Sequence, residues 1–117
     1  MNPDELARLP FAYLTTTGRR SGRPHRIEIW FALEGGTIYL LAGGRDGADW
    51  VRNAIATPAV SIELGDEIRV GTARVLAPAT DEDALARRLL VEKYRSREDD
   101  LASWGRTALP VAIDPAT

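Results

Sequence analysis

Short segments in which apolar and polar residues alternate constrain the fold of this 117-residue chain more than any other feature. In residues 26–33 every second residue, from Ile27 to Leu33, is large and apolar. A period of two is typical of a β-strand with one buried face, and residues 59–64 repeat it. Residues 37–42 are mostly apolar on both faces, as expected for a central strand covered on each side. We therefore predict a mainly β (α+β) protein.

The expected strands number six and are separated by two to four short helices. Near Gly71 and Thr72 the apolar positions change parity, which predicts a bulge or a sharp bend. Bent, long strands favour a small antiparallel barrel, and residues 1–117 are predicted to form one domain. Such a barrel is filled by its own side chains, so a sizeable ligand must bind outside it or between subunits. The strands are expected at 11–15, 26–33, 37–42, 59–64, 67–77 and 108–114, and the helices near 3–8, 48–57, 80–95 and 101–104.

Five residues carry predictions about where helices and strands begin or end. Asp46 is expected to cap the helix at 48–57, and Thr80 with Asp83 resembles a capping box for the helix at 80–95. Gly105 is expected to stop the last helix. Pro110 indicates an edge position or a strand end, because proline cannot donate to a sheet ladder.

Composition excludes several kinds of site. The chain has no cysteine and one histidine, His25, which argues against disulfides, thiolate catalysis, zinc fingers and a triad drawn from several histidines. The acidic clusters 81–83 and 98–100 lie at expected helix starts, where negative charge is favourable without a metal, so we expect no metal site. We find neither an apolar run long enough to span a membrane nor a signal-peptide pattern, so a cytoplasmic protein is expected.

Residues 14–26 form a basic stretch with turn-forming residues and no acidic residue. Gly18 and Gly22 allow the backbone amides to converge, and arginine forks around such a bend suit phosphate or carboxylate. The formal net charge of the whole chain is −2, so the positive charge is local. The alternative is a solvated hairpin loop. A nucleic-acid interface is not expected, since no series of stacking aromatics accompanies the arginines, which are Arg19, Arg20, Arg23 and Arg26.

Two tryptophans leave a binding role and a packing role open. On the helix expected at 48–57, Asn53 belongs to the polar face. Together with Trp50, it borders the apolar face. They could line a ligand site near the helix start, or Trp50 could pack in the core. Trp30, on the polar face of the strand at 26–33, is expected to be an interface anchor or a ligand platform.

Two stretches, FAYLTTTGRRSGRPHRIEIWF and YLLAGGRDGADWVRNAIATPAVSIEL, carry a family resemblance. The chain resembles the deazaflavin (coenzyme F-420)-dependent nitroreductase family, within the pyridoxamine 5'-phosphate oxidase-like split β-barrel flavoprotein superfamily. The resemblance covers nearly the whole chain. It implies an FMN-binding type of split barrel and a homodimer with the cofactor in a groove between subunits. Carried over by position, it assigns phosphate contacts to Arg19, Arg20, Ser21 and Gly22, and a second cofactor border to Gly44, Arg45, Trp50 and Asn53.

The resemblance also implies an oxidoreductase. A reduced deazaflavin would transfer hydride to a small electrophilic acceptor, such as an activated alkene, a quinone or a nitro compound, and the cofactor would carry the chemistry. The further arginines, at positions 23, 26, 45 and 52, favour the acidic tail of coenzyme F-420 over FMN, the alternative cofactor. A non-catalytic flavin or deazaflavin carrier or sensor is the alternative function. No catalytic residue is assigned; a proton could come from water or from Tyr13, Tyr39 or Tyr94.

Overall fold

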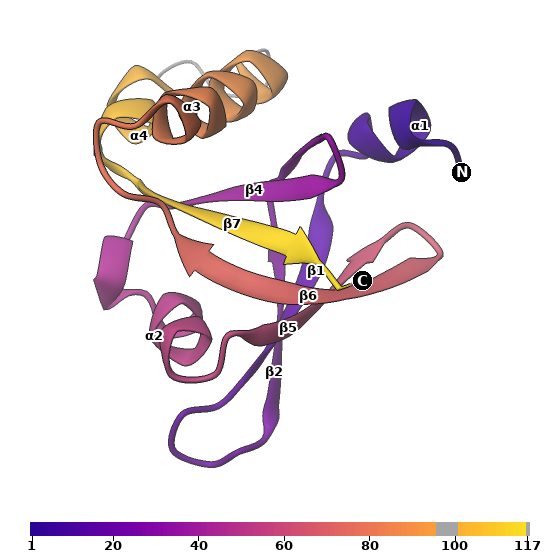
Figure 1. The fold of residues 1–117 in the computed structure, drawn as a ribbon, viewed down its shortest axis with the longest axis vertical. Helices are drawn as coiled ribbons and strands as arrows, with labels where there is room; N and C mark the ends of the chain where they lie inside the picture. The colour runs from indigo at the N-terminus through magenta and orange to yellow at the C-terminus, as the bar shows by residue number, and fades with distance from the viewer. Residues whose placement is uncertain (96–100, 117) are drawn as a thin grey trace.

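The computed structural model describes residues 1–95 and 101–116 and contains, within them, seven strands in one antiparallel sheet of order β2-β1-β5-β6-β7-β4-β3 (Figure 1). The strands are β1 (Ala12–Thr17), β2 (Pro24–Ile29), β3 (Ala32–Glu34), β4 (Thr37–Ala42), β5 (Ala59–Leu64), β6 (Glu67–Val75) and β7 (Leu109–Pro115). The helices are α1 (Pro3–Ala7), the 3-10 turn η1 (Arg45–Gly47), α2 (Asp49–Ala56), α3 (Asp81–Tyr94) and α4 (Ala102–Thr107).

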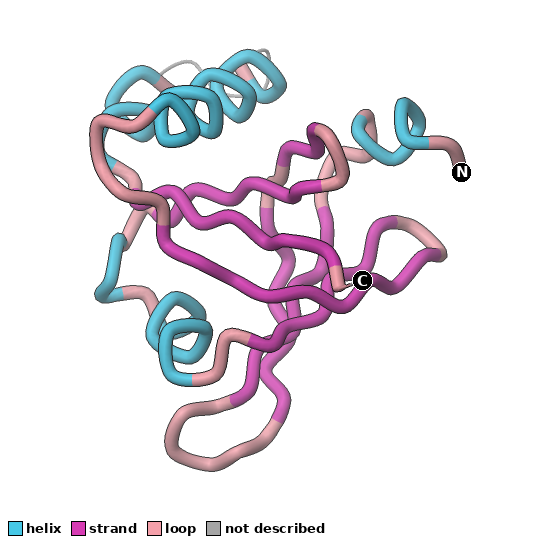
Figure 2. Tube along the Cα trace, viewed as in Figure 1, coloured by secondary structure: helices cyan, strands magenta, loops and turns pink. Residues whose placement is uncertain are grey.

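The sheet curls into a split barrel. Its edge strands, β2 and β3, follow one another in the chain, and Figure 2 shows the strands wrapping around a common interior. The predicted mainly β split barrel is confirmed, but the number of strands is seven instead of six. The expected strand at 26–33 is interrupted at Phe31, whose side chain is fully buried. The backbone of Phe31 bonds to Tyr94 from α3: its N–H donates to the phenol oxygen at 3.1 Å, and its carbonyl accepts from the phenol at 3.2 Å.

Two apolar cores lie on the two sides of β4, which explains why both faces of this strand are apolar. One core fills the inside of the curled sheet and includes Leu14, Leu40 and Ile62. The other lies beneath α3 and α4, which cover β4 and β7 in Figure 1, and includes Leu90 and Tyr94. Trp30 packs within this second core, so no ligand is needed to explain it. Its ring stacks on that of Tyr94 with centroids 4.2 Å apart, and it meets Trp104 edge to face.

Near Gly71, where a bulge or a sharp bend was predicted, β6 changes its partner strand. β6 pairs with β5 up to Thr72 and with β7 from Gly71 onward, and both ladders run without an inserted residue, so no bulge forms. A Cβ at Gly71 would lie 2.5 Å from the carbonyl oxygen of Asp114. Glycine therefore lets β6 and β7 approach closely where the partner changes.

The predictions about where helices and strands begin and end were partly confirmed. Thr80 caps α3, since its hydroxyl accepts from the N–H of Asp83 at 3.2 Å. The prediction that Asp46 caps α2 was wrong. Asp46 lies inside η1, and α2 begins after Ala48 without a side-chain cap. The prediction that Gly105 ends the last helix was also wrong. It lies within α4, where a Cβ would come 2.5 Å from a methyl carbon of Val91, so glycine permits close packing of α4 on α3.

Pro110 is the second residue of β7, which runs between β6 and β4. The strand-end interpretation is confirmed, and the edge position was wrong. Among the described helices, none combines the length and the apolar character that crossing a membrane requires.

Candidate functional site

The basic stretch forms the turn between β1 and β2. Two backbone hydrogen bonds close it: the N–H of Gly18 donates to the carbonyl of Arg23, and the N–H of Gly22 donates to that of Gly18, each at 2.8 Å. Gly22 has a φ of 71°, which favours glycine. The hydroxyl of Ser21 accepts from the N–H of Arg23 at 3.1 Å. The turn is thus held by its own backbone, and its side chains are available for other contacts.

Asn53 of α2 fastens this turn to the body of the protein. Its side-chain oxygen accepts from the backbone N–H of Arg19 at 3.1 Å and from the guanidinium of Arg19 at 2.9 Å. Its amide nitrogen donates to the hydroxyl of Thr16 at 3.3 Å. The prediction that Asn53 lies on the polar outer face of the helix was wrong, because Asn53 is 3% exposed whereas Ile55 is 57% exposed. The hydrogen bonds that α2 makes to the turn rotate Asn53 inward.

An open pocket of about 280 Å³ lies between the turn and α2. We call it the turn pocket. It brings together four of the predicted cofactor-binding residues, Arg19, Arg20, Ser21 and Asn53. Gly22 belongs to the same turn but not to the pocket wall. The complete wall is formed by Gly18, Arg19, Arg20, Ser21, His25, Asp49 and Asn53.

The cations of the turn differ in how far they are already paired. Arg19 forms an ion pair with Asp49 at 3.2 Å in addition to its bonds to Asn53. The guanidinium groups of Arg20 and Arg23, by contrast, make no hydrogen bond or ion pair with any residue in the described part of the chain. A free guanidinium beside a pocket can accept a phosphate or carboxylate as a two-point partner. The turn pocket is therefore suited to an anionic group.

The structure does not bring Gly44, Arg45 and Trp50 to this pocket. Arg45 lies in η1 with a φ of 53°, and its guanidinium donates to the carbonyl of Thr107. Gly44 faces Ala48, and Trp50 packs against the core inside the sheet. The assignment of these three residues as a second cofactor border stays a prediction.

Three residues of the turn pocket, Gly18, His25 and Asp49, were not among the predicted site residues. A Cβ at Gly18 would lie 2.6 Å from the Nε2 atom of His25, so glycine allows the imidazole to fold over the turn. The hairpin register pairs Thr16 with His25, which places the imidazole at the pocket mouth. Asp49 lies one helical turn before Asn53 and so shares its face. Hairpin pairing could have revealed His25, and helical spacing could have revealed Asp49.

A second hollow, an open groove of about 440 Å³, runs along the outer face of β1, β5 and β6. Hydroxyl groups from Thr15, Ser61 and Thr72 line it together with Val70. Val70 is 61% exposed and its neighbour Ile68 is 67% exposed. This face combines hydrogen-bonding groups with uncovered apolar side chains.

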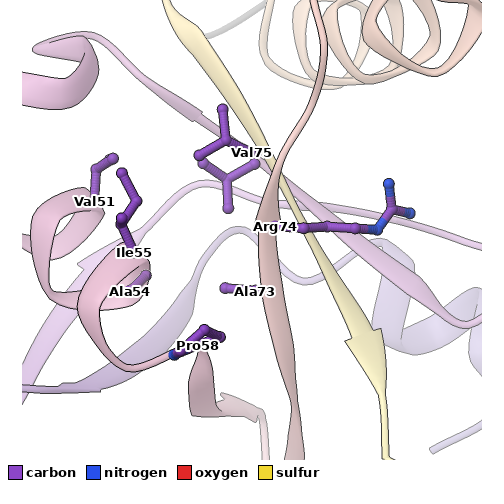
Figure 3. Close-up of a pocket in the computed structure, with 8 residues that line it drawn as sticks. Val51, Ala54, Ile55, Pro58, Ala73, Arg74 and Val75 are labelled. Carbon is purple, nitrogen blue, oxygen red and sulfur yellow. The ribbon is translucent and has the colours of Figure 1, made fainter.

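A third, smaller pocket of about 110 Å³ lies between α2 and β6 (Figure 3). Its wall is almost wholly apolar, with Val51, Ile55 and Val75 around it. Arg74 contributes only its stem, because Figure 3 shows its guanidinium directed away from the apolar side chains. This pocket offers no charged group to a ligand.

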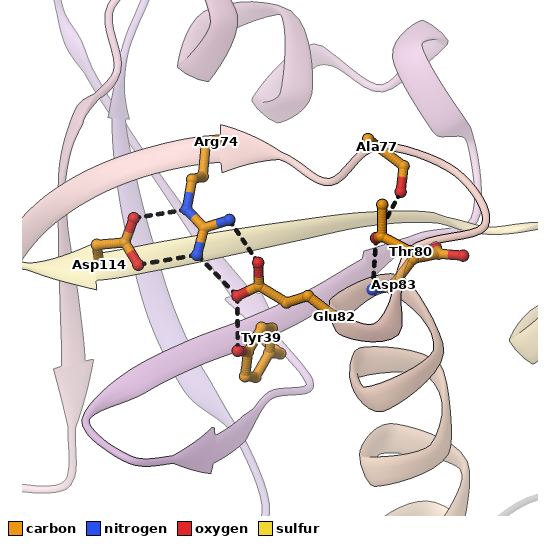
Figure 4. Close-up of polar contacts among 7 residues, drawn as sticks. All are labelled: Tyr39, Arg74, Ala77, Thr80, Glu82, Asp83 and Asp114. Carbon is orange, nitrogen blue, oxygen red and sulfur yellow. Dashed lines mark hydrogen bonds and ion pairs between the residues drawn. The ribbon is translucent and has the colours of Figure 1, made fainter.

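The guanidinium of Arg74 belongs to a cluster that joins β4, β6, β7 and α3 (Figure 4). It bonds to both carboxylate oxygens of Glu82 at 2.7 Å and to both of Asp114 at 2.6 and 3.1 Å. The hydroxyl of Tyr39 donates to Glu82 at 2.8 Å. Hydrogen bonds from Arg74 and then Tyr39 lower the pKa of Glu82 to about 2. We call these four residues the Arg74 cluster.

Two of the three candidate proton-donating tyrosines are held in place by the fold. Burial, followed by the hydrogen bond to Glu82, raises the pKa of Tyr39 to about 12, so its phenol keeps its proton. Tyr94 is fully buried, with its hydroxyl bonded to the carbonyl of Pro10 at 3.0 Å. Tyr13 is half-buried, and the guanidinium of Arg26 lies 3.8 Å above its ring.

Within the residues that the structure describes, no group of carboxylates and histidine is arranged to hold a metal ion. Asp83, in the acidic cluster at 81–83, bonds to the guanidinium of Arg87 at 3.0 Å. The cluster at 98–100 lies outside the described residues.

Comparison with known proteins shows that the chain is similar in sequence and in fold to F420-dependent reductases. A family model described as F420H(2)-dependent quinone reductase matches residues 3–115. The solved structure of an F420-H2 dependent reductase, FDR-A, is 27% identical with a TM-score of 0.74, over 90% of this chain and 94% of that one. A structure described as a domain-swapped dimer is 26% identical with a TM-score of 0.75, over 97% and 87% of the two chains.

The fold is shared more widely than the sequence. A Listeria innocua structure assigned to the pyridoxamine 5'-phosphate oxidases is 14% identical with a TM-score of 0.70. The alignment covers 96% of this chain and 88% of that one. At this identity the likeness concerns the split barrel alone.

Proposed function

Because the chain belongs to the F420H(2)-dependent quinone reductase family, we propose that it uses reduced coenzyme F-420, a deazaflavin, to transfer hydride to a small electrophilic acceptor. A quinone is the first acceptor to test, and activated alkenes and nitro compounds follow. The family match spans residues 3–115 and thus includes the whole basic turn and α2. One structural observation carries the proposal for the cofactor: the free guanidinium of Arg20 at the turn pocket.

The residues of the turn pocket fit the anionic end of this cofactor. Arg20 would bind the phosphate as a two-point partner, and the hydroxyl of Ser21 would add a donor from the same turn. Gly22, whose N–H donates to the carbonyl of Gly18, would shape the turn around the anion. Arg19 would contribute positive charge from the pocket wall. Asn53, with its three hydrogen bonds, would keep the turn at a fixed distance from α2.

When bound, the deazaflavin supplies the hydride, so the chain itself needs to position cofactor and acceptor and to limit access of water. Tyr39 and Tyr94 hold the fold together, and we assign them no part in proton transfer. The proton for the reduced acceptor would come from water.

We further propose that the outer face of β5 and β6 contacts a second copy of the chain. The exposed side chains of Ile68 and Val70 lie beside the groove on this face. Covering them would remove apolar surface from water and close the groove from one side. The similar structure described as a domain-swapped dimer supports an assembly of two chains.

The test is a turnover assay with purified protein. Reduced coenzyme F-420 is mixed with a panel of quinones, enones and nitroaromatics, and the return of the oxidised deazaflavin absorbance is followed. We expect oxidation that requires both the protein and an acceptor, and that falls when Arg20 and Arg23 are replaced by alanine. Reduced FMN serves as the comparison cofactor.

Two results would contradict the proposal in different ways. Tight binding of the deazaflavin without turnover of any acceptor would favour a carrier or sensor. Binding and turnover with FMN but not with the deazaflavin would make the protein a flavin enzyme.

A further inference from the structure

We propose that Asp49 is a built-in competitor for the cofactor phosphate, and that it limits how tightly the turn pocket binds this anion. This inference rests on the proposed function, because it concerns the same pocket. Asp49 is the acidic member of the pocket wall, and its carboxylate already bonds to Arg19 at 3.2 Å.

The geometry shows that the Asp49 carboxylate can move away from Arg19 without disturbing the pocket. The side chain of Asp49 is 85% exposed, whereas that of Arg19 is 24% exposed. Arg19 is also held by Asn53 through both its backbone N–H and its guanidinium, so it keeps its place if Asp49 leaves. One Asp49 oxygen accepts a single hydrogen bond, and an exposed ion pair of this kind contributes little to stability.

The charge of Asp49 has two consequences for an incoming anion. It occupies one donor of Arg19, and it repels negative charge near Arg20. A phosphate can overcome this repulsion because its oxygens can accept hydrogen bonds from both Arg19 and Arg20. Asp49 would therefore weaken the binding of anions, and most of all the binding of those that bring the most negative charge to the pocket.

Asp49→Asn tests the idea, since asparagine keeps the shape of the side chain and removes its charge. Asp46→Asn is the matched control: it removes the same charge three residues earlier, in η1, at a residue outside the pocket wall. Dissociation constants are measured by calorimetry for coenzyme F-420 and for the same deazaflavin without its phosphate and acidic tail. Thermal unfolding shows whether each variant is folded.

For Asp49→Asn we expect roughly fivefold tighter binding of coenzyme F-420, as the loss of one nearby like charge at a wet surface predicts. Binding of the phosphate-free deazaflavin should stay within about twofold, because no charged group of that ligand faces residue 49. Asp46→Asn should leave both constants unchanged.

Equal or weaker binding of coenzyme F-420 by folded Asp49→Asn would overturn the inference and leave the proposed function standing. An equal gain for the phosphate-free ligand would also overturn it, because the effect would then not act through the phosphate. If the native protein bound neither ligand, the proposed function would fail and this inference with it. Asp49→Ser, which also removes the charge, replaces Asp49→Asn if the latter does not fold.

Discussion

The Arg74 cluster and the basic turn are both rich in arginine, but they use it in opposite ways. Arg74 places its donors on four carboxylate oxygens of Glu82 and Asp114, all within the chain. The guanidinium groups of Arg20 and Arg23, within the described residues, donate to no other side chain or carbonyl. Arg19 is intermediate, since it is shared between Asn53 and Asp49.

The difference shows what distinguishes a binding site from a structural clamp. Both regions carry charged side chains at the surface of the protein. Of these two regions, within the described residues, only the turn leaves a guanidinium group, that of Arg20, unpaired beside a pocket. An unpaired donor next to open space, and not the number of arginines, distinguishes the turn from the Arg74 cluster.

The largest expected effect is on cofactor binding, which should depend on the arginines of the turn and not on Arg74. Arg20→Ala combined with Arg23→Ala should weaken coenzyme F-420 binding roughly 30- to 100-fold, because two charge-assisted contacts to the anion are lost. The unfolding free energy should change by no more than about 0.5 kcal/mol, since both side chains are exposed and unpaired. Calorimetric titration and urea unfolding give the two values. Arg74→Ala is the control, with affinity expected within about twofold of the native protein.

The next effect concerns the residue that joins the turn to the rest of the protein. Asn53→Ala removes three hydrogen bonds of a buried amide and should lower the unfolding free energy by about 2 kcal/mol. The affinity for coenzyme F-420 should fall as well, because the turn loses its fixed position. Arg52→Ala, one residue earlier and exposed, should change stability by no more than about 0.5 kcal/mol. Native stability in Asn53→Ala would show that the turn is held by other contacts.

A smaller effect tests the clamp directly. Arg74→Met leaves Glu82 and Asp114 facing each other without their cation, and should lower the unfolding free energy by about 1 kcal/mol. The value is modest because the Arg74 side chain is 42% exposed and water screens the charges. Adding Glu82→Gln removes one of the two like charges and should recover part of the loss. A loss of cofactor affinity in Arg74→Met would break the division between the two regions.

The smallest effect is the pH dependence of the same clamp. The pKa of Glu82 is lowered from 4.5 to about 2, so its ionised form stabilises the folded state above pH 4.5. That contribution is lost as the pH falls from 4.5 toward 2. Over this range the native protein should lose up to about 1 kcal/mol more stability than Glu82→Gln, after allowance for screening. Parallel curves from urea unfolding would mean that the clamp does not couple to folding.

Alternation along the chain was sufficient to predict a mainly β protein, because one buried face imposes a period of two in any sequence, whereas the split barrel was implied by the family resemblance. The cap at Thr80 was predictable for a similar reason, as its bonds join residues three apart. The interruption at Phe31 was not predictable, since it depends on Tyr94, which is 63 positions away. Local patterns cannot indicate that a distant phenol replaces a neighbouring strand.

The candidate site divides in the same manner. The turn itself could be predicted, since glycines and arginines lie within a few residues of one another. The inward rotation of Asn53 could not, because its partners Arg19 and Thr16 come from another strand and turn. For Asp49, helical spacing places it near Asn53, but only the fold shows its bond to Arg19.

The central claim is that the turn pocket holds the phosphate of the cofactor. A crystal structure of the protein with coenzyme F-420 tests it most directly. The account predicts phosphate oxygens about 3 Å from the guanidinium of Arg20, with the Asp49 carboxylate displaced from Arg19. A well-ordered cofactor whose phosphate lies elsewhere, with Arg20 still unpaired and the Asp49 pair intact, would contradict it.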